Sequence, residues 1–298
     1  MALPTYATPI QRTYYYAYLF FCGVVFFFLV APLIAIVPIS FSVSPFMVFT
    51  EGMLSWPPDP EAWSLRWYRN MIGDCSAEVV SSTVPCSTKW MKGTVNSFYI
   101  GIIATFIATV LGTMAALGLS RPHMPYKALI MSILISPMIV PLIITAAGMF
   151  FFYARINLVY TFTGVILAHV ALATPFVVIT VTATLVGFDM NMVKAAQSLG
   201  AKPMRTFFKV IMPLILPGII SGALFAFITS FDEVVIVMFM ASIDQLTIPK
   251  QMWAGIRQEI SPVILCMATC LVILSIVLLT TVELLRRRAE RLRGIKAR

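Results

Sequence analysis

Charged residues are scarce in this sequence. Only 11% of its 298 residues are Asp, Glu, Lys or Arg, whereas 60% are hydrophobic, and the mean hydropathy is +0.93. Water must wet the exterior of a soluble domain, and this composition cannot supply enough polar surface for that. A soluble globular domain is therefore excluded, and an exterior that faces lipid is indicated.

Residues for catalysis and metal binding are also few. The two histidines, His123 and His169, are far apart in the sequence, and neither belongs to an HExxH pattern or to an acidic cluster at metal-ligand spacing. No GxSxG pattern is present. We therefore predict that the chain is not an enzyme, that it binds no metal, and that His169 makes a polar contact between helices.

The sequence is instead dominated by long apolar runs. Six of them are long enough to cross a hydrocarbon core of roughly 30 Å as helices, which pair every backbone group internally. The alternating polarity of a membrane barrel is absent. We predict an all-α integral membrane protein with six transmembrane helices. The predicted segments are 14–40, 94–119, 128–152, 161–186, 211–241 and 262–284.

The positions of Lys and Arg predict the orientation of these helices. With the N-terminus inside, the inner segments carry twice as many Lys and Arg residues as the outer ones, so the N-in/C-in topology is favoured. The net charge of +9 thus reflects membrane topology, and no nucleic-acid partner is expected. The first apolar run is too long for a signal peptide and no small-residue cleavage site follows it, so we expect it to be retained.

Four parts are predicted along the chain. Residues 1–41 are the N-terminus and first transmembrane helix, and residues 42–93 are a small folded insert in a long periplasmic loop. Residues 92–284 form a core of five helices. Residues 285–298 are a basic cytoplasmic tail, for which anchoring to anionic headgroups is the simplest role.

The five cysteines fall into two groups. Cys22, Cys266 and Cys270 lie in apolar segments, where cysteine packs as a small hydrophobic residue. Cys75 and Cys86 lie in the predicted outer loop, where an oxidising periplasm favours a disulfide between them.

A rigid elbow is predicted on the inner side, between the fourth and fifth segments, at about residues 187–210. Asp189 is suited to begin a helix, and Gly200 is placed to end that helix in the left-handed conformation. Pro203 suits the first turn of a second short helix, and Pro213 can open the fifth membrane segment. Such an element lies along the bilayer surface and can transmit force into the two helices that it joins.

Two small residues, Ala195 and Ala196, are expected to point outward from this elbow. Small side chains let another protein approach the backbone closely, so the elbow is suited to docking. The alternative is a generic interfacial loop that is rich in alanine.

The spacing of this stretch resembles the "EAA" loop of binding-protein-dependent ABC importer permeases. The pattern of that loop is Glu-Ala-Ala, three residues, Gly, nine residues, Ile, one residue and Leu-Pro. This chain keeps the spacing with Ala195, Ala196, Gly200, Val210 for Ile, Met212 for Leu, and Pro213. Lys194 stands where the family usually has Glu, so a salt bridge from that position to the ATPase is not expected, while the docking geometry is kept.

The resemblance implies a type I ABC importer transmembrane domain, with residues 92–284 as the family core. Its partners would be a cytoplasmic ATPase dimer, a second permease subunit that is a homologous but different chain, a periplasmic substrate-binding protein and the lipid bilayer. The protein would be located in the bacterial inner membrane. Since the chain has no GxxxxGK[ST] phosphate loop, ATP and Mg²⁺ would be held by the ATPase, and no cofactor by this chain.

Two carboxylates, Asp232 and Glu233, are predicted well inside the fifth segment, about 28 Å along the helix from Pro213. Carboxylates in a membrane are costly, so they face a cavity or a partner, and here they would attract a cationic substrate. The alternative is that they lie solvated at the helix end or pair with basic groups of the partner subunit.

The substrate prediction rests on a further resemblance. Phe231–Val235, Leu246–Pro249 and Ile260–Pro262 are similar to the spermidine/putrescine permease group, which implies import of a polyamine. An opine, an amino-acid derivative or an aminophosphonate is the alternative substrate. A secondary transporter is the other alternative, although such transporters show paired broken helices and here Pro137 and Pro141 would kink only the third helix.

Overall fold

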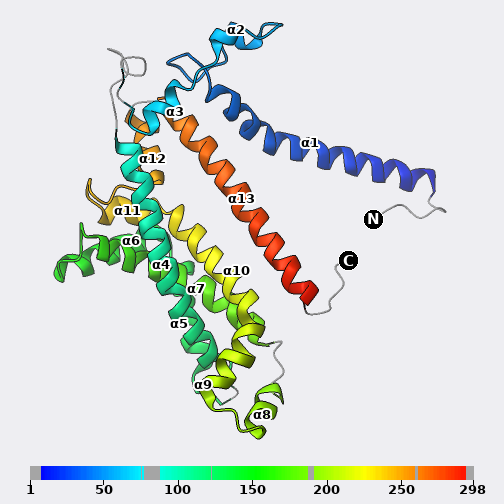
Figure 1. The fold of residues 1–298 in the computed structure, drawn as a ribbon, viewed down its shortest axis with the longest axis vertical. Helices are drawn as coiled ribbons and strands as arrows, with labels where there is room; N and C mark the ends of the chain where they lie inside the picture. Colours follow the sequence, from blue (N-terminus) through cyan, green and yellow to red (C-terminus); the bar gives the residue numbers. More distant parts are fainter. Residues whose placement is uncertain are drawn as a thin grey trace. The chain divides into compact units, whose positions relative to one another are not determined.

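The computed structural model describes most of the chain as helices (Figure 1). The described residues are 8–74, 76, 88–121, 123–186, 191–258 and 261–292. Among them the only β pairing is one isolated antiparallel bridge between Ser42 and Trp63. The predicted all-α fold class is confirmed. The chain divides into two compact units, residues 1–87 with 259–278 and residues 88–258 with 279–298.

Five helical spans are long and apolar enough to cross a membrane, and a sixth is formed if one bent pair of helices counts as a single span. This agrees with the predicted number of segments. The five unbroken spans are Pro9–Ile39 (α1), Lys89–Leu119 (α4), Phe162–Val186 (α7), Pro203–Phe231, and Val263–Thr281 within α13 (Val263–Leu292).

The third predicted segment, 128–152, is not one kinked helix. It is divided into α5 (Lys127–Ile139) and α6 (Leu142–Arg155), whose axes are bent by 101°. The break follows from Pro141, which has no N–H to continue the helix and which disfavours helical backbone at the residue before it. Val140 is accordingly extended, with a ψ of 136°.

The fifth predicted segment, 211–241, is also divided. Its main helix, α10 (Met212–Phe231), ends at Asp232, and a separate short helix, α11 (Val235–Met240), follows. We call residues 232–234 the α10–α11 joint. The division was not predicted because the residues on both sides of the joint are apolar, so the hydrophobic pattern runs through it without interruption.

Helices α4, α7 and α10 pack against one another and form the core of the second unit (Figure 1). Glycines allow the close approach of the three helices, as is usual where lipid supplies no hydrophobic driving force for association. A Cβ atom added to Gly112 would lie 2.7 Å from the Cβ of Val177, and one added to Gly218 would collide with Thr184. These contacts hold α4 and α10 against α7.

The first unit contains residues 42–74 of the predicted loop insert, with α2 (Glu51–Leu54), a 3₁₀ turn (Pro60–Ala62) and α3 (Arg66–Met71). Trp67 is buried, and its indole Nε1 donates to the carbonyl of Ser42 at 2.8 Å. Trp56, by contrast, is 94% exposed. The predicted disulfide between Cys75 and Cys86 lies outside the described residues.

Candidate functional site

The first part of the candidate site is the elbow formed by α8 (Asn191–Ser198) and the residues after it. Gly200 has a φ of +78°, in the left-handed region. Its N–H donates to the carbonyl of Gln197 at 2.9 Å, and the N–H of Ala201 donates to the carbonyl of Ala196 at 3.0 Å. This pair of hydrogen bonds is the Schellman motif, so the corner predicted at Gly200 is present. Asp189 lies outside the described residues.

The chain leaves this corner as a continuous helical path into the membrane. Pro203 occupies the first turn of α9 (Pro203–Thr206), as predicted, and a π-helical turn (Phe207–Ile211) joins α9 to α10. Pro213 lies in the first turn of α10. The wider π turn suits this place, because a proline ring clashes with the carbonyl four residues earlier in a regular helix.

One face of α8 carries exposed apolar and small side chains. Met192, Ala195 and Leu199 follow helical spacing, and Leu199 is 88% exposed. Ala196 is half-buried, because α8 packs against α9 and the π turn. Lys194 is exposed. The elbow therefore presents Ala195, rather than both alanines, on an apolar face that has no covering element among the described residues.

The second part of the candidate site is the α10–α11 joint, where the two predicted carboxylates have different environments. Asp232 caps the end of α10 and is exposed. Glu233 is only 7% exposed, and its Oε1 accepts a hydrogen bond from the N–H of Ile236 at 2.9 Å, which caps the start of α11. The structure thus places the carboxylates at a helix end, and only Asp232 is open to a ligand.

Asp232 continues an exposed face of α10. Phe225, Ile228 and Asp232 are all exposed and follow one another at helical spacing. The Phe225 ring stacks on Phe176 of α7, with 6.4 Å between the ring centroids. A neighbouring aromatic cluster, where the first half of α4 meets the end of α10, is formed by Phe98, Phe227 and Phe231.

Helix α11 is held at its other end by two backbone contacts. The N–H of Tyr160 donates to the carbonyl of Met240 at 2.9 Å, and the ammonium of Lys250 donates to the carbonyls of Val237 and Ala241. The desolvation of Lys250 lowers the pKa of its ammonium. Lys250 was not predicted as part of the site, because nothing in the local sequence places it near the end of α11.

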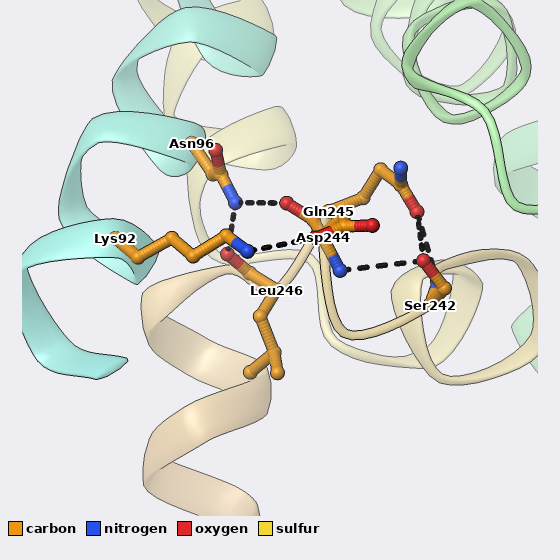
Figure 2. A network of polar contacts seen from close by, with 6 residues as sticks. All are labelled: Lys92, Asn96, Ser242, Asp244, Gln245 and Leu246. Atoms are coloured by element: carbon orange, nitrogen blue, oxygen red, sulfur yellow. Dashed lines mark hydrogen bonds and ion pairs between the residues drawn. The ribbon is translucent and has the colours of Figure 1, made fainter. Parts of the chain in front are cut away.

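A polar network ties the loop after α11 to the start of α4 (Figure 2). The amide of Asn96 donates to the carbonyls of Asp244 and Leu246, at 2.7 and 2.9 Å. The Lys92 ammonium lies 2.8 Å from the Asp244 carboxylate, and Ser97 accepts a hydrogen bond from the N–H of Ile248 at 2.8 Å. The same network therefore fixes the start of α12 (Ile248–Gln258).

His169 joins α7 to the end of α10. Its Nδ1 lies 2.8 Å from the Oγ of Ser230, two residues before Asp232. The polar contact between helices that was predicted for His169 is therefore present. No described group of three or more His, Cys, Asp or Glu residues has the geometry of a metal site.

The family of the chain follows from its comparison with known proteins. Residues 108–291 match the family described as binding-protein-dependent transport system inner membrane component. The chain belongs to this family. The matched region begins inside α4, includes the elbow and the joint, and ends in the last turn of α13, so both parts of the candidate site lie within it.

Curated relatives and a solved structure agree with this family. The chain is 27% identical over 268 residues to the spermidine/putrescine transport system permease protein PotC of Haemophilus influenzae, covering 90% of this chain and 95% of that protein. It is 29% identical to the putrescine transport system permease protein PotI of Escherichia coli, covering 82% and 81%. Its fold is similar to a bacterial ABC transporter involved in the import of the acidic polysaccharide alginate, with a TM-score of 0.68, 13% identity and coverage of 96% and 99%.

This member of the family is an ABC importer permease subunit with the fold of a type I importer transmembrane domain. It is a multi-pass protein of the bacterial inner membrane. Permeases of this family are not enzymes, because ATP is hydrolysed by a separate subunit, and they work with a substrate-binding protein. Membership of this family excludes the alternative of a secondary transporter.

Proposed function

We propose that this permease imports a small cationic solute, with a polyamine such as spermidine or putrescine as the substrate. Two observations support this substrate. The relatives with 25–29% identity over most of the chain are named as polyamine permeases. The exposed face of α10 also carries the aromatic ring of Phe225 and ends in the Asp232 carboxylate, and both kinds of group attract an amine cation. Permeases for an opine, an amino-acid derivative or an aminophosphonate are the alternative.

Asp232 and Glu233 have different roles in this proposal, and the exposure of Asp232 is the observation that carries it. A carboxylate exposed to lipid would be costly, so this face of α10 is suited to a pathway between subunits. Asp232 meets the cation there, whereas Glu233 caps α11 and thereby keeps the joint in place.

The elbow transmits the motion that opens and closes the pathway. In the proposal, the face of Met192, Ala195 and Leu199 docks into one subunit of the ATPase dimer, and Lys194 makes no salt bridge to it. The Schellman corner at Gly200 and the helical path through Pro213 make the elbow rigid, so a displacement of α8 moves α10. A flexible loop would absorb that displacement.

The remaining components lie outside this chain. ATP and Mg²⁺ are held by the ATPase, and this permease binds no cofactor. The second permease is a homologous but different chain, which closes the pathway opposite the exposed face of α10. A periplasmic binding protein delivers the cargo to the outer side.

The test is uptake of radiolabelled putrescine by the complete transporter in proteoliposomes that contain ATP. Asp232→Asn removes the charge and is expected to raise the KM about tenfold, the equivalent of about 1.4 kcal/mol of lost attraction. Asp244→Asn is the matched control, since Asp244 is an exposed carboxylate whose partner is Lys92. An unchanged KM in Asp232→Asn would show that Asp232 is not part of the pathway. Saturable uptake of an amino-acid derivative without any uptake of putrescine would show that the substrate is not a polyamine.

A further inference from the structure

His169 and Ser230 form a buried polar pair in the core of α4, α7 and α10. The side chain of His169 is 1% exposed and that of Ser230 is 4% exposed. The 2.8 Å contact between Nδ1 and Oγ joins α7 to the last turn of α10, across 61 residues of sequence. The buried residues next to His169 in α7, Ala168 and Val170, are apolar.

Packing alone does not account for an imidazole at this position. The other ring nitrogen of His169, Nε2, is buried and has no hydrogen-bond partner within the described part of the chain. A buried polar atom without a partner is unfavourable, and an aliphatic side chain would fill the same space without this cost. What the imidazole adds to the fold is its directed contact with Ser230.

The position of Ser230 shows what this contact holds. Ser230 lies two residues before Asp232, so the contact fixes the turn that ends at the joint. On the other side of the joint, α11 is fixed by the Glu233 cap and by the contacts of Tyr160 and Lys250. The joint therefore lies between two anchored helices, and His169 provides the hydrogen bond between helices on the α10 side.

We propose that His169 is a positioning residue of the transport pathway, which sets the place of the Asp232 carboxylate through its hydrogen bond to Ser230. This inference rests on the proposed function, because it takes Asp232 as the carboxylate that meets the cation. His169 itself is buried and does not touch the cargo. Loss of the hydrogen bond lets the last turn of α10 rotate, and the carboxylate then leaves the position in which it attracts the amine.

Three substitutions separate this role from simple packing. His169→Leu removes the hydrogen bond and keeps an apolar filling, whereas His169→Asn places a polar atom near the position of Nδ1. Ser230→Ala removes the same hydrogen bond from α10 with a smaller change of volume. The matched control is Thr174→Val, because the hydroxyl of Thr174 donates within α7 to the carbonyl of Val170.

The experiment measures KM and Vmax for putrescine with the complete transporter in proteoliposomes. We expect His169→Leu and Ser230→Ala to raise the KM about fivefold with little change in Vmax, and His169→Asn and Thr174→Val to stay within about twofold of the wild type. In an Asp232→Asn background, His169→Leu should add nothing further, since the carboxylate that it positions is absent. Co-purification of the ATPase shows that each variant is assembled.

Three outcomes would overturn the proposal. An equal rise of the KM in the Asp232→Asn background would mean that His169 acts independently of the carboxylate. A KM that rises in Asp232→Asn but not in Ser230→Ala would overturn the positioning role and leave the proposed function intact. An Asp232→Asn variant with wild-type KM would overturn both. If the His169→Leu variant fails to assemble, the KM of Ser230→Ala tests the same hydrogen bond.

Discussion

The side chain of Asn96, near the start of α4, donates to the backbone carbonyl of Leu246, 150 residues later in the chain, at a distance of 2.9 Å (Figure 2). The same amide also donates to the carbonyl of Asp244. One side chain thus satisfies two backbone acceptors of a loop that has no regular structure. This contact places the start of α12 against the start of α4.

Removal of this amide should loosen the loop. Asn96→Ala leaves two backbone carbonyls without their donor and is expected to lower the free energy of unfolding by about 1–3 kcal/mol. Lys92→Ala removes an exposed ion pair beside it and should cost less than about 1 kcal/mol. Thermal unfolding of the two variants in detergent, at low and high salt, compares them. Equal losses, or a salt-dependent loss in Asn96→Ala, would contradict this account.

A side chain at Gly200 should impair coupling. Gly200→Val forces a β-branched residue to a φ of +78°, which costs at least about 1–2 kcal/mol and favours a different corner. We expect both co-purification of the ATPase and uptake to fall. Gly118→Val is the control, because Gly118 has an ordinary helical backbone with open space around it. Intact uptake by Gly200→Val would show that the corner is not needed.

The contact between Gly218 and Thr184 should tolerate no added methyl group. Gly218→Ala brings a Cβ atom onto the Thr184 side chain and is expected to destabilise the packing of α7 and α10 by about 1–3 kcal/mol. Thr184→Ala should partly restore stability in the double variant. The melting temperatures of the two single variants and the double variant test this, and strictly additive losses would argue against direct contact. Gly148→Ala, which meets open space, is the control.

The disulfide between Cys75 and Cys86 stays a prediction from the sequence. Closing this short loop should stabilise the insert by about 2–4 kcal/mol. Peptide mapping of the protein purified without reductant should yield one cross-linked peptide that contains both cysteines. Free thiols at both positions, in protein taken from an oxidising compartment, would contradict the predicted disulfide.

Acid should weaken the turn after α3. The backbone N–H of Ser76 and the guanidinium of Arg69 hold the pKa of the Asp74 carboxyl below its usual value of 3.8. The stability from this carboxylate is therefore fully present above that value and is lost as the pH falls through the lower pKa of the folded state. Asp74→Asn should abolish this part of the acid dependence of unfolding, and an identical acid profile in the variant would contradict the assignment.

The fifth predicted segment shows why part of the site could not be predicted from the sequence. The carboxylates at Asp232 and Glu233 were identified, because charge within a long apolar run is conspicuous. Their separation into an exposed residue and a buried cap was not predicted. It depends on the break of the helix, and the apolar run on both sides of the joint conceals that break.

The amino-acid sequence by itself determined the number of membrane spans and the corner at Gly200. Both are local properties, since about 20 consecutive apolar residues suffice to cross a bilayer and a left-handed corner requires one glycine. Only the tertiary structure decided that Asn96 holds Leu246 and that His169 meets Ser230. Each of these contacts joins a helix to a distant part of the chain, and it depends on how the elements of the second unit pack rather than on any pattern along the sequence.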